Sequence, residues 1–528
     1  MRLIAWIGLL WSIQVAWALS EPDAFAQRCR SFLAGHLADS QRPTVDFVAA
    51  GTNLTFYGTN TTCDHISITA PTDLCRASLS VPTSTRSGVD IELWLPSNWT
   101  GRFLQTGNGG IDGCIRYEDL AYGISNGFAT AGSNNGHDGK TAAALYQNDE
   151  VTIDFAWRAL RASVVVGKNL VESFYNKPHR KAYYMGCSLG GRQGIDAAAR
   201  FPDDFDGILV GAPAVDFNNM TSWRASFFPI TGRAGSARFL TKEQWALVHR
   251  EVLRQCDGID GVEDGIISDP TLCQFQADRL RCVAGRVEGC LSTAQVETVR
   301  KVLSPLVDED GQLIYPAMQP GSEIAAAEGL YSGTPWPYST EWFKYVIYNP
   351  TWDPASFTVH DAYVADARNP GAIRTWPSDL SAFRRRGGKL ILYHGQQDEK
   401  ITSFNSQRFY DHLSRAMGLS SAAMDGFLRF FRVPGMGHCA GGPGAWGFGQ
   451  MGGASAQGVR FERETNALAA LVAWVEEDGP GPDTVLGRKF VDDRMERGVE
   501  KERAHCRYPL RSMYAGGNAS LAGSWRCM

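Results

Sequence analysis

One stretch of the chain decides the fold: KAYYMGCSLGGRQGIDAAARF, residues 181–201. Its first five residues are mostly apolar or aromatic and predict a buried strand, and residues 192–201 predict a helix. Between them stands the turn Gly186-Cys187-Ser188-Leu189-Gly190. In a strand–turn–helix context, a G-x-S-x-G turn is typical of a nucleophile elbow, which lifts the serine Oγ above the sheet. We therefore expect Ser188 to act as a nucleophile and the Leu189 N–H to face a developing oxyanion.

Short apolar runs alternate with helical periodicity on both sides of this elbow. Such alternation predicts an α/β fold with a largely parallel sheet. Between residues 216 and 375 the alternation stops, and cysteines, prolines and tryptophans gather instead. We interpret the chain as an α/β-hydrolase fold with a large inserted lid domain (216–375) between two parts of the core (19–215 and 376–528). The expected strands are 91–96, 102–106, 128–132, 181–185, 207–210, 389–393 and 428–433, and the expected core helices are 155–174, 192–201 and 465–477.

A nucleophilic serine needs a base and a carboxylate that orients the base. In α/β-hydrolases the three follow the order serine, acid, histidine, each at the carboxyl end of a strand. Asp398 follows the strand expected at 389–393, and His438 follows the one expected at 428–433. His137 is the only serious rival to His438, but it precedes Ser188, which is the wrong order for this fold. We therefore expect a triad of Ser188, Asp398 and His438.

The cysteines add a second constraint on this site. Cys187 directly precedes Ser188, and Cys439 directly follows His438. If the serine and the histidine meet, these two thiols come within bonding reach. Pairing elsewhere stays possible, because disulfide connectivity cannot be deduced from sequence alone.

The N-terminus and the composition indicate the compartment. Residues 1–18 have the features of a secretory signal peptide: Arg2, an apolar run and an A-x-A cleavage site. The alternative is a membrane anchor, which requires a longer stretch of apolar residues. Twelve cysteines suit an oxidising exterior. The net charge of −5 over 528 residues argues against nucleic acid as the partner, and no membrane association is expected of the mature chain. Five sequons are candidate glycosylation sites: Asn53, Asn60, Asn98, Asn219 and Asn518.

An acidic, glycine-rich run lies inside the expected lid. Residues 256–266 place Asp257, Asp260 and Asp264 in one turn-rich loop. Hard carboxylate oxygens on a loop that can curl suit Ca²⁺, whereas Mg²⁺ prefers fewer protein ligands. The competing interpretation is a solvated acidic turn. Cys256 and Cys273 flank the run and are expected to pair, and the short spacing of Cys282 and Cys290 makes them a plausible local pair. No organic cofactor is expected.

Together, Gly186-Cys187-Ser188, Asp398 and His438-Cys439 resemble the Cys-Ser-Asp-His-Cys signature of the tannase and feruloyl esterase family. The resemblance extends over nearly the whole mature chain, includes residues 106–110, 191–194, 387–390 and 435–439, and is strongest to the fungal type B feruloyl esterases. In that family the residue at Leu189 is often Thr and the one at Glu399 is often Pro; neither difference changes a catalytic atom.

The resemblance implies roles for several further residues. It makes Ser188 the nucleophile, His438 the general base and acid, and Asp398 its orienting carboxylate. A second oxyanion N–H would come from Gly109 or Gly110, between which the sequence does not choose. The resemblance also implies a structural calcium held by the side chains of Asp257, Asp260 and Asp264 and the carbonyls of Val262 and Ile266. The remaining disulfides that it implies are Cys29–Cys75, Cys63–Cys114, Cys282–Cys290 and Cys506–Cys527.

The resulting expectation is a secreted serine carboxylic ester hydrolase that releases ferulic, p-coumaric or related acids from plant cell-wall polysaccharide esters. The alternative within the same chemistry is a tannase that cleaves galloyl esters. A secreted carboxypeptidase or lipase shares the triad but does not predict its cysteine neighbours. A non-catalytic binding module on this fold would typically have lost the serine or the histidine. Aromatic side chains of the lid are candidates for a flat slot that accepts a phenolic ring.

Overall fold

The computed structural model describes residues 21–32, 41–56, 63, 66–283, 288–477 and 479–528. The expected signal peptide (1–18) and the sequon at Asn60 lie outside the described residues.

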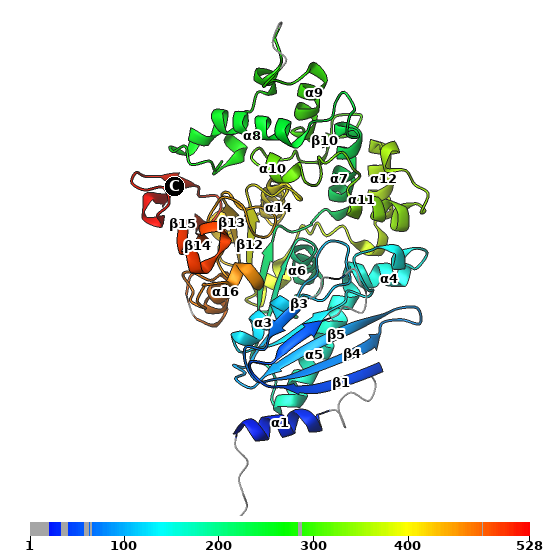
Figure 1. Ribbon diagram of the computed structural model, residues 1–528. Coiled ribbons are helices and arrows are strands. Elements are labelled where there is room, and N and C mark those ends of the chain that lie inside the picture. Colours follow the sequence, from blue (N-terminus) through cyan, green and yellow to red (C-terminus); the bar gives the residue numbers. More distant parts are fainter. Residues whose placement is uncertain (1–20, 33–40, 57–62, 64–65, 284–287, 478) are drawn as a thin grey trace, which may run out of the picture.

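A nine-stranded mixed sheet forms the centre of the described chain (Figure 1). Its order is β1-β4-β5-β7-β6-β8-β9-β12-β13. The pairs from β1 to β7 are antiparallel, and all pairs from β7 to β13 are parallel. The strands are β1 (Gln41–Val48), β4 (Leu74–Pro82), β5 (Gly88–Pro96), β6 (Arg102–Thr106), β7 (Phe128–Ser133), β8 (Lys181–Cys187), β9 (Gly207–Gly211), β12 (Lys389–Gly395) and β13 (Leu428–Val433).

The seven strands expected from sequence are all present, and the strand order with helices between them is that of an α/β-hydrolase. The antiparallel strands β1 and β4 were not expected. The alternation of apolar and polar residues is hard to recognise in the sequence of β4, because small and polar residues stand between its buried apolar ones. The parallel strands were easier to predict, since burial on both faces makes them continuous apolar runs.

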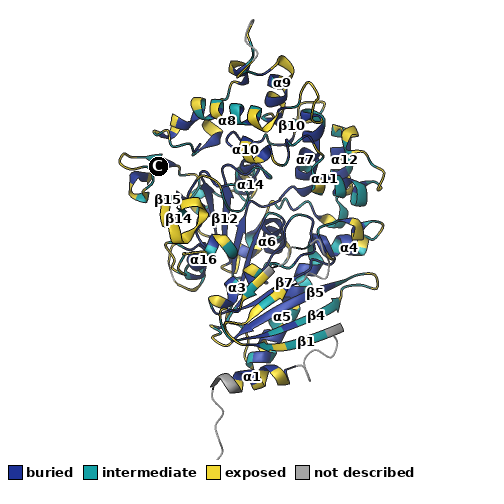
Figure 2. Ribbon diagram, in the orientation of Figure 1, coloured by how far each residue is buried: buried dark blue, intermediate teal, exposed yellow. Residues whose placement is uncertain are grey.

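Helices cover both faces of the sheet, and alternate side chains of one strand enter different cores. Leu390 and Leu392 of β12 pack with one cluster, whereas Ile391 and Tyr393 pack with the other. Figure 2 shows these central strands as buried. The first face is covered by α1 (Glu21–Ser31), α5 (Ala159–Tyr175), α6 (Leu189–Arg200), α13 (Ser381–Arg385), α14 (Ser403–Ala416) and α15 (Ser421–Met424), and the second by α3 (Tyr117–Ser125) and α16 (Ala467–Glu476).

The helix after the elbow begins earlier than its sequence pattern predicts. We expected a start at Arg192, but α6 begins at Leu189, directly after Ser188. The two glycines Gly190 and Gly191 are therefore helical, and they are needed for close packing. A Cβ on Gly191 would lie 2.4 Å from the Gly211 carbonyl oxygen. The sequence suggested a longer turn because glycine lowers helix propensity.

The expected helix at 155–174 is also modified at its start. Residues Asp154–Arg158 form a π-helical turn before α5, and the short helix α4 (Asp149–Ile153) precedes them. Asn176, in the left-handed conformation, ends α5. The expected helix at 465–477 begins at Ala467, because the Asn466 side chain accepts a hydrogen bond from Ala469 N–H and caps it.

Between β9 and β12 the chain forms a mainly helical layer above the carboxyl ends of the parallel strands (Figure 1). Its own apolar core contains Trp223, Trp245 and Trp342, all nearly inaccessible to solvent. The elements are α7 (Phe217–Thr231), α8 (Lys242–Cys256), α9 (Thr293–Val302), α10 (Glu323–Ala326), α11 (Pro337–Trp342), α12 (Val359–Arg368) and the hairpin β10 (Leu306–Val307)–β11 (Leu313–Tyr315).

Besides the β10–β11 hairpin, the described residues form three further two-stranded sheets. Strands β14 and β15 were not expected from sequence. β15 contacts the acidic loop, because its Arg503 forms an ion pair with Asp264. The pairs are β2 (Asn53–Phe56) with β3 (Ile66–Thr69), β14 (Thr484–Phe490) with β15 (Val499–Cys506), and β16 (Ser512–Tyr514) with β17 (Trp525–Cys527).

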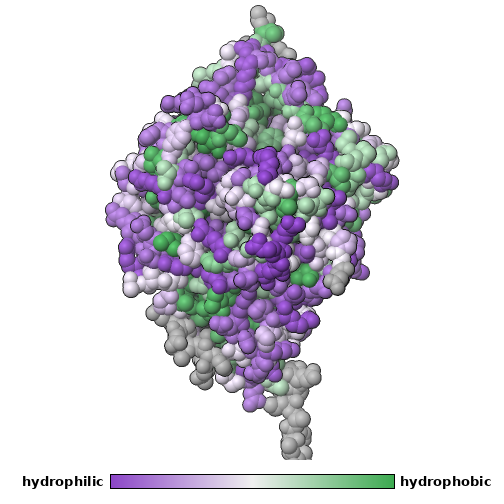
Figure 3. All heavy atoms as spheres, turned by 180° about the vertical axis from the view of Figure 1, so that it is seen from behind, coloured by the Kyte–Doolittle hydropathy of each residue, from purple (hydrophilic) through white to green (hydrophobic). Residues whose placement is uncertain are grey.

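The face of the molecule opposite to the view of Figure 1 is predominantly polar. Seen from behind, hydrophilic side chains cover most of the face, and apolar groups form separate patches (Figure 3). Among the described helices, none has the length and apolar character that crossing a bilayer requires.

Candidate active site

Ser188 occupies a strained turn at the carboxyl end of β8. Its φ of 63° and ψ of −119° fall in a region that non-glycine residues rarely adopt. Three backbone hydrogen bonds hold it there: Ser188 N–H donates to Gly211, and the Ser188 carbonyl accepts from Arg192 and Ala214. Glycine is required at position 190, two residues after Ser188, since a Cβ there would lie 2.9 Å from the Asn108 carbonyl oxygen. This geometry is that of a nucleophile elbow.

The loop after β6 lies against the first turn of α6. Gly190 N–H donates to the Asn108 carbonyl at 2.9 Å, and Asn108 N–H donates to Gln193 Oε1 at 3.0 Å. Gly109 and Gly110, the two candidates for the second oxyanion donor, follow directly and both line the cavity that contains Ser188. Leu189 is the first residue of α6, so its N–H has no preceding helical turn to bond with.

Asp398 and His438 meet at the adjacent strand ends. Asp398 follows β12, is fully buried, and accepts a hydrogen bond from His438 Nδ1–H at 2.7 Å. Its other oxygen, Oδ1, accepts the backbone N–H groups of Lys400 and Ile401 at 2.7 and 2.8 Å. The carboxylate therefore fixes the ring of His438 with Nε2 free to act on the serine.

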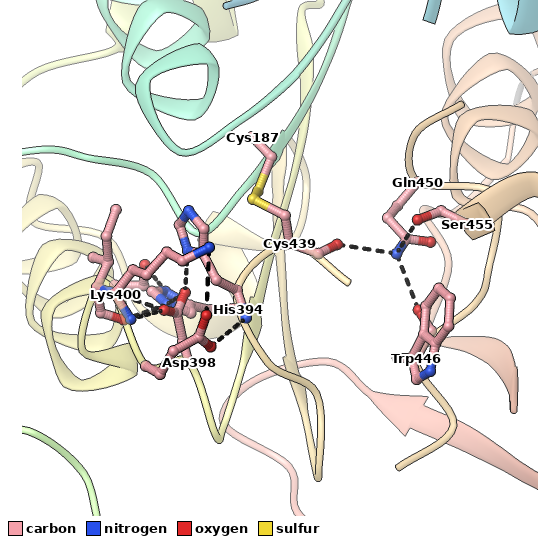
Figure 4. The surroundings of a disulfide bond; sticks show 12 residues. Cys187, His394, Asp398, Lys400, Cys439, Trp446, Gln450 and Ser455 are labelled. Carbon is pink, nitrogen blue, oxygen red and sulfur yellow. Dashed lines mark hydrogen bonds and ion pairs between the residues drawn. A yellow bond between two sulfur atoms is a disulfide. The ribbon is translucent and has the colours of Figure 1, made fainter. Parts of the chain in front are cut away.

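A second histidine shares the same carboxylate oxygen. The His394 Nε2–H lies 3.1 Å from Asp398 Oδ2 and 3.0 Å from the Ile401 carbonyl, and its Nδ1 accepts the Ser406 hydroxyl at 2.7 Å (Figure 4). His394 precedes Asp398 by four residues, and a local hydrogen bond between them agrees with that spacing. The structure makes it a donor to the triad carboxylate.

Opposing effects act on the pKa of Asp398. Burial raises the pKa, but the neighbouring His438 and the hydrogen bonds from His394 and His438 lower it, and the net pKa lies well below the usual range. Asp398 is thus kept as a carboxylate, the form that can stabilise an imidazolium.

The disulfide Cys187–Cys439 joins the residue before Ser188 to the residue after His438. Its Cα atoms are 6.0 Å apart (Figure 4). Glu399 adds a further restraint, because its Oε2 accepts His438 N–H at 3.1 Å. The other bridges follow the pairing that the sequence and its resemblance implied: Cys29–Cys75, Cys63–Cys114, Cys256–Cys273, Cys282–Cys290 and Cys506–Cys527.

Ser188 and His438 line one cavity of about 220 Å³. Within the described residues no hydrogen bond joins their side chains; in substrate-free sites such bonds are frequently long and tighten on binding. The cavity wall also contains residues that the sequence did not single out, because nothing in their local pattern marks them: Arg116, Asp119, Arg224, Tyr338, Lys400 and Met451.

Tyr338 is the aromatic residue that the lid contributes to this wall. It lies so close to Gly110 that a Cβ there would be 2.7 Å from the ring. Trp342 is instead fully buried against Phe155 and Phe217, and Trp352 stacks on Phe343. These tryptophans pack the lid and do not form the slot that we considered from the sequence.

His137, the rival base, lies elsewhere. It is buried, its Nε2 bonds to the Ile111 carbonyl at 3.0 Å, and its ring packs edge-on against Phe155. Burial lowers its pKa. It is absent from the wall of the Ser188 cavity.

The acidic loop of the lid is folded by its own carboxylates. Asp257 accepts backbone N–H groups of Asp264, Gly265 and Ile266, and Asp260 accepts that of Val262. Asp260 Oδ2 is buried and has no hydrogen-bond partner. Within the described part of the chain, no three His, Cys, Asp or Glu side chains form a metal-holding group, so any ion here needs backbone carbonyls as well.

The strand order, the elbow after β8, and the acid and histidine after β12 and β13 define a protein of the α/β-hydrolase class with the residues of a serine hydrolase. Among these, the chain belongs to the tannase and feruloyl esterase family. The model of the family described as "Tannase and feruloyl esterase" matches residues 75–528.

Individual relatives agree with this family. The chain is 57% identical over 512 residues to a probable feruloyl esterase B-2 of Aspergillus flavus, covering 97% of this chain and 98% of the relative. The crystal structure of feruloyl esterase B from Aspergillus oryzae matches with a TM-score of 0.92 and 45% identity, covering 96% and 100% of the two chains. A tannin acyl hydrolase from Aspergillus niger shares the fold, with a TM-score of 0.73, 22% identity and coverage of 94% and 92%.

Proposed function

We propose that this protein is a serine carboxylic ester hydrolase, with Ser188 as nucleophile, His438 as general base and acid, and Asp398 as orienting carboxylate. The observation that carries the proposal is the 2.7 Å hydrogen bond from His438 Nδ1–H to the buried Asp398. The Cys187–Cys439 disulfide links the residue next to His438 to the residue next to Ser188. A non-catalytic module has no need of this arrangement.

The chemistry follows from these positions. His438 Nε2 takes the proton of Ser188 Oγ as the oxygen attacks the ester carbonyl, and the Leu189 N–H with that of Gly109 or Gly110 stabilises the oxyanion. The alcohol leaves with the proton from His438, so that Ser188 carries the acyl group. Water then gives its proton to His438 and attacks the acyl-enzyme, and Ser188 recovers a proton as the carboxylic acid is released.

The acyl group that we propose is a hydroxycinnamoyl group, such as feruloyl or p-coumaroyl, esterified to plant cell-wall polysaccharide. The support is the name of the 57% identical relative and of the similar crystal structure. The match to the tannin acyl hydrolase is too distant in sequence to indicate more than the fold.

The deciding measurement is kcat/KM for methyl ferulate, methyl p-coumarate, methyl caffeate and methyl gallate on the purified protein. Preference for the cinnamates supports the proposal, and preference for gallate would make the protein a tannase. Ser188→Ala is the control, and we expect it to remove turnover while leaving the far-UV and near-UV circular dichroism unchanged. Turnover at the wild-type rate in this variant would refute the assignment of the nucleophile.

We further propose that the protein is secreted and glycosylated. The supporting observations are the signal peptide expected at 1–18 and the six disulfides, which persist in oxidising compartments. Asn53, Asn98 and Asn518 are exposed and are the proposed glycan sites. Asn219 is less suitable, because its Nδ2 donates to Asp216 within α7. Peptide mass mapping of the secreted protein before and after glycosidase treatment tests all four.

We also propose that the acidic loop holds a structural Ca²⁺, with the side chains of Asp257, Asp260 and Asp264 and the carbonyls of Val262 and Ile266 as ligands. The donor chemistry is suitable, since these are hard oxygens. The three carboxylates do not form a metal-holding group in the described structure, so the proposed binding requires the loop to draw them together. The unpartnered Asp260 Oδ2 supports the proposal.

Metal analysis and thermal unfolding test the calcium proposal. We expect one Ca²⁺ per chain and a lower Tm after dialysis against a chelator, restored by Ca²⁺ and not by Mg²⁺. Asp260→Asn should weaken calcium binding, whereas Asp278→Asn, which alters an exposed lid carboxylate paired with Arg281 and Arg300, should not. A protein without bound calcium whose Tm ignores the chelator would contradict the proposal.

A further inference from the structure

Arg224 is a buried cation without an acidic partner in the catalytic cavity. It comes from the lid helix α7, is 6% exposed, and lines the same cavity as Ser188 and His438. Its Nε–H donates to the Lys400 carbonyl at 2.8 Å. Among the described residues, no carboxylate oxygen forms an ion pair with its guanidinium within 4 Å. Asp398 and Glu399 act on Arg224 from further away, but both carboxylates already accept hydrogen bonds from His438.

Two other arginines at the lid–core boundary have partners within the protein for their guanidinium groups. Arg408, on the core helix α14, forms an ion pair with Asp216 at 3.1 Å, at the start of α7. Arg192 is fully buried, but it donates to the Thr375 hydroxyl and the Ala156 carbonyl and is not part of the cavity wall. Arg224 differs from both because its guanidinium is buried and borders open space beside the nucleophile.

A buried charge without a partner costs free energy unless an opposite charge arrives. Burial lowers the pKa of Arg224, yet a guanidinium stays charged at any pH at which this fold operates. Its free N–H groups are therefore available to a ligand, and the fork of donors matches a carboxylate in a bidentate manner.

The charged residues of the cavity wall also bear on which ligand the cavity binds. Of the described residues that line it, three are permanent cations, Arg116, Arg224 and Lys400, and the only Asp or Glu is Asp119. Burial raises the pKa of Asp119 to about 6, which reduces its negative charge in mildly acidic solution. Arg116 forms an ion pair with Asp112, and Lys400 forms one with Glu399, both at 3.5 Å. Among the described residues of this wall, Arg224 is therefore the cation that remains for an anion.

The position of Arg224 indicates which part of an ester the anion belongs to. Arg224 bonds to the backbone of Lys400, and Lys400 N–H bonds to Asp398, which holds His438. His438 Nε2 gives the proton to the departing alcohol, and Arg224 and Lys400 line the same cavity as His438. The oxyanion loop, with Tyr338 against Gly110, provides another part of the wall.

We propose that Arg224, with Lys400 beside it, forms a subsite for a carboxylate carried by the alcohol part of the ester. This inference rests on the proposed function and deepens it: the preferred substrates are phenolic esters of acidic alcohols, such as hydroxy acids or uronic-acid residues. Methyl esters and esters of neutral sugars leave the subsite without its anion.

Two matched probes test the subsite: O-feruloylglycolate, which bears a carboxylate on the alcohol, and O-feruloylglycolamide, its neutral counterpart. The readout is the ratio of their kcat/KM values, divided by the ratio of their hydroxide-catalysed rates to remove differences in intrinsic reactivity. We expect a normalised ratio of at least tenfold in favour of glycolate for the wild type, about what one charge-assisted hydrogen bond provides. A wild-type ratio of one or less would overturn the proposal, whether or not any variant folds.

Variants then assign the effect to Arg224. Arg224→Gln should lower the normalised ratio about tenfold, Arg224→Lys should retain more of it, and Lys400→Gln should lower it by a smaller factor. Arg408→Gln removes a lid–core arginine outside the cavity and should leave the ratio unchanged. If Arg224→Gln slows both probes equally, Arg224 only positions the acid loop, and the subsite is refuted.

Methyl ferulate separates this inference from the proposed function. It carries no anion, so its turnover by the wild type reports ester hydrolysis alone. A folded wild type that hydrolyses neither methyl ferulate nor the probes refutes the proposed function, whereas turnover of methyl ferulate without preference for glycolate refutes only the subsite.

Discussion

The Cys187–Cys439 disulfide should support catalysis as well as stability. We consider the double variant Cys187→Ala with Cys439→Ala, which removes the bridge without leaving a free thiol. The bridge joins the neighbours of Ser188 and His438, residues on two different strand ends. Without it, only noncovalent packing sets the separation between nucleophile and base.

The expected loss of stability follows from the length of the closed loop. The bridged cysteines are 252 residues apart, and the chain-entropy model then gives ~5 kcal/mol at 25 °C. Two smaller disulfides nested in this loop, with separations of 17 and 8 residues, change the logarithm very little. The expected loss of activity is separate: a displacement of about 1 Å between reacting groups typically costs ~100-fold in rate.

Urea unfolding in non-reducing buffer and kcat/KM for methyl ferulate measure the two effects. The matched control is Cys506→Ala with Cys527→Ala, whose separation of 21 residues gives ~3 kcal/mol on the same model and which lies in the C-terminal hairpin region, outside the cavity wall. We expect the first pair to cost about 2 kcal/mol more stability than the control, and to be the one that lowers kcat/KM markedly.

Two results would refute this reasoning. If the Cys187–Cys439 variant keeps wild-type kcat/KM, packing alone positions the serine and the histidine. If both pairs lower the free energy of unfolding equally, loop length does not govern the stabilisation.

Two further predictions concern groups with shifted protonation. His394→Phe removes a hydrogen bond that lowers the pKa of Asp398, so the pKa of Asp398 should rise and the acid limb of the kcat/KM profile for methyl ferulate should move to higher pH. Ser406→Ala keeps that hydrogen bond and should shift the limb less; an unmoved limb in His394→Phe would contradict a positioning role. Burial raises the pKa of Asp119 from 3.8 to about 6, so its ionisation destabilises the folded state as the pH rises from about 4 to 6. Asp119→Asn removes the ionisable group but keeps the acceptor for Gly452 N–H. In urea titrations it should therefore raise the free energy of unfolding by roughly 2–3 kcal/mol above pH 6 and give no gain below pH 4. An equal gain at both pH values would show that ionisation is not the cause.

The strands and the positions of Ser188, Asp398 and His438 at strand ends could be predicted, because each has a strong local signal; the catalytic roles of these residues stay a prediction. Buried parallel strands are short continuous apolar runs, and the turn at Ser188 has both a glycine pattern and a strand–helix context. Asp398 and His438 then follow from chain order alone. The helical layer between β9 and β12 lies where the periodicity of the core is interrupted in the sequence, and the lid domain at 216–375 stays a prediction.

Residues of the cavity wall could not be predicted in the same way. Arg224 sits in the middle of a helix and Tyr338 near the start of another, and neither position is distinguished by its neighbours in sequence. Their role depends on how the lid packs on the sheet, which is a tertiary property. His394 was visible as a residue near Asp398, but only the geometry shows that its imidazole donates to Asp398 Oδ2.

The pairing of β9 with β12 also sets the order in which a growing chain can complete its sheet. Gly207 pairs with Lys389, 182 positions further along, so these neighbours meet only after the whole intervening layer has been synthesised. Closing so long a loop is entropically costly and slow. The strand that carries Ser188 thus leaves the ribosome well before the loops that carry Asp398 and His438. A nascent chain therefore holds Ser188 without Asp398 or His438 until the last third of translation, and early termination yields a product that lacks both later residues.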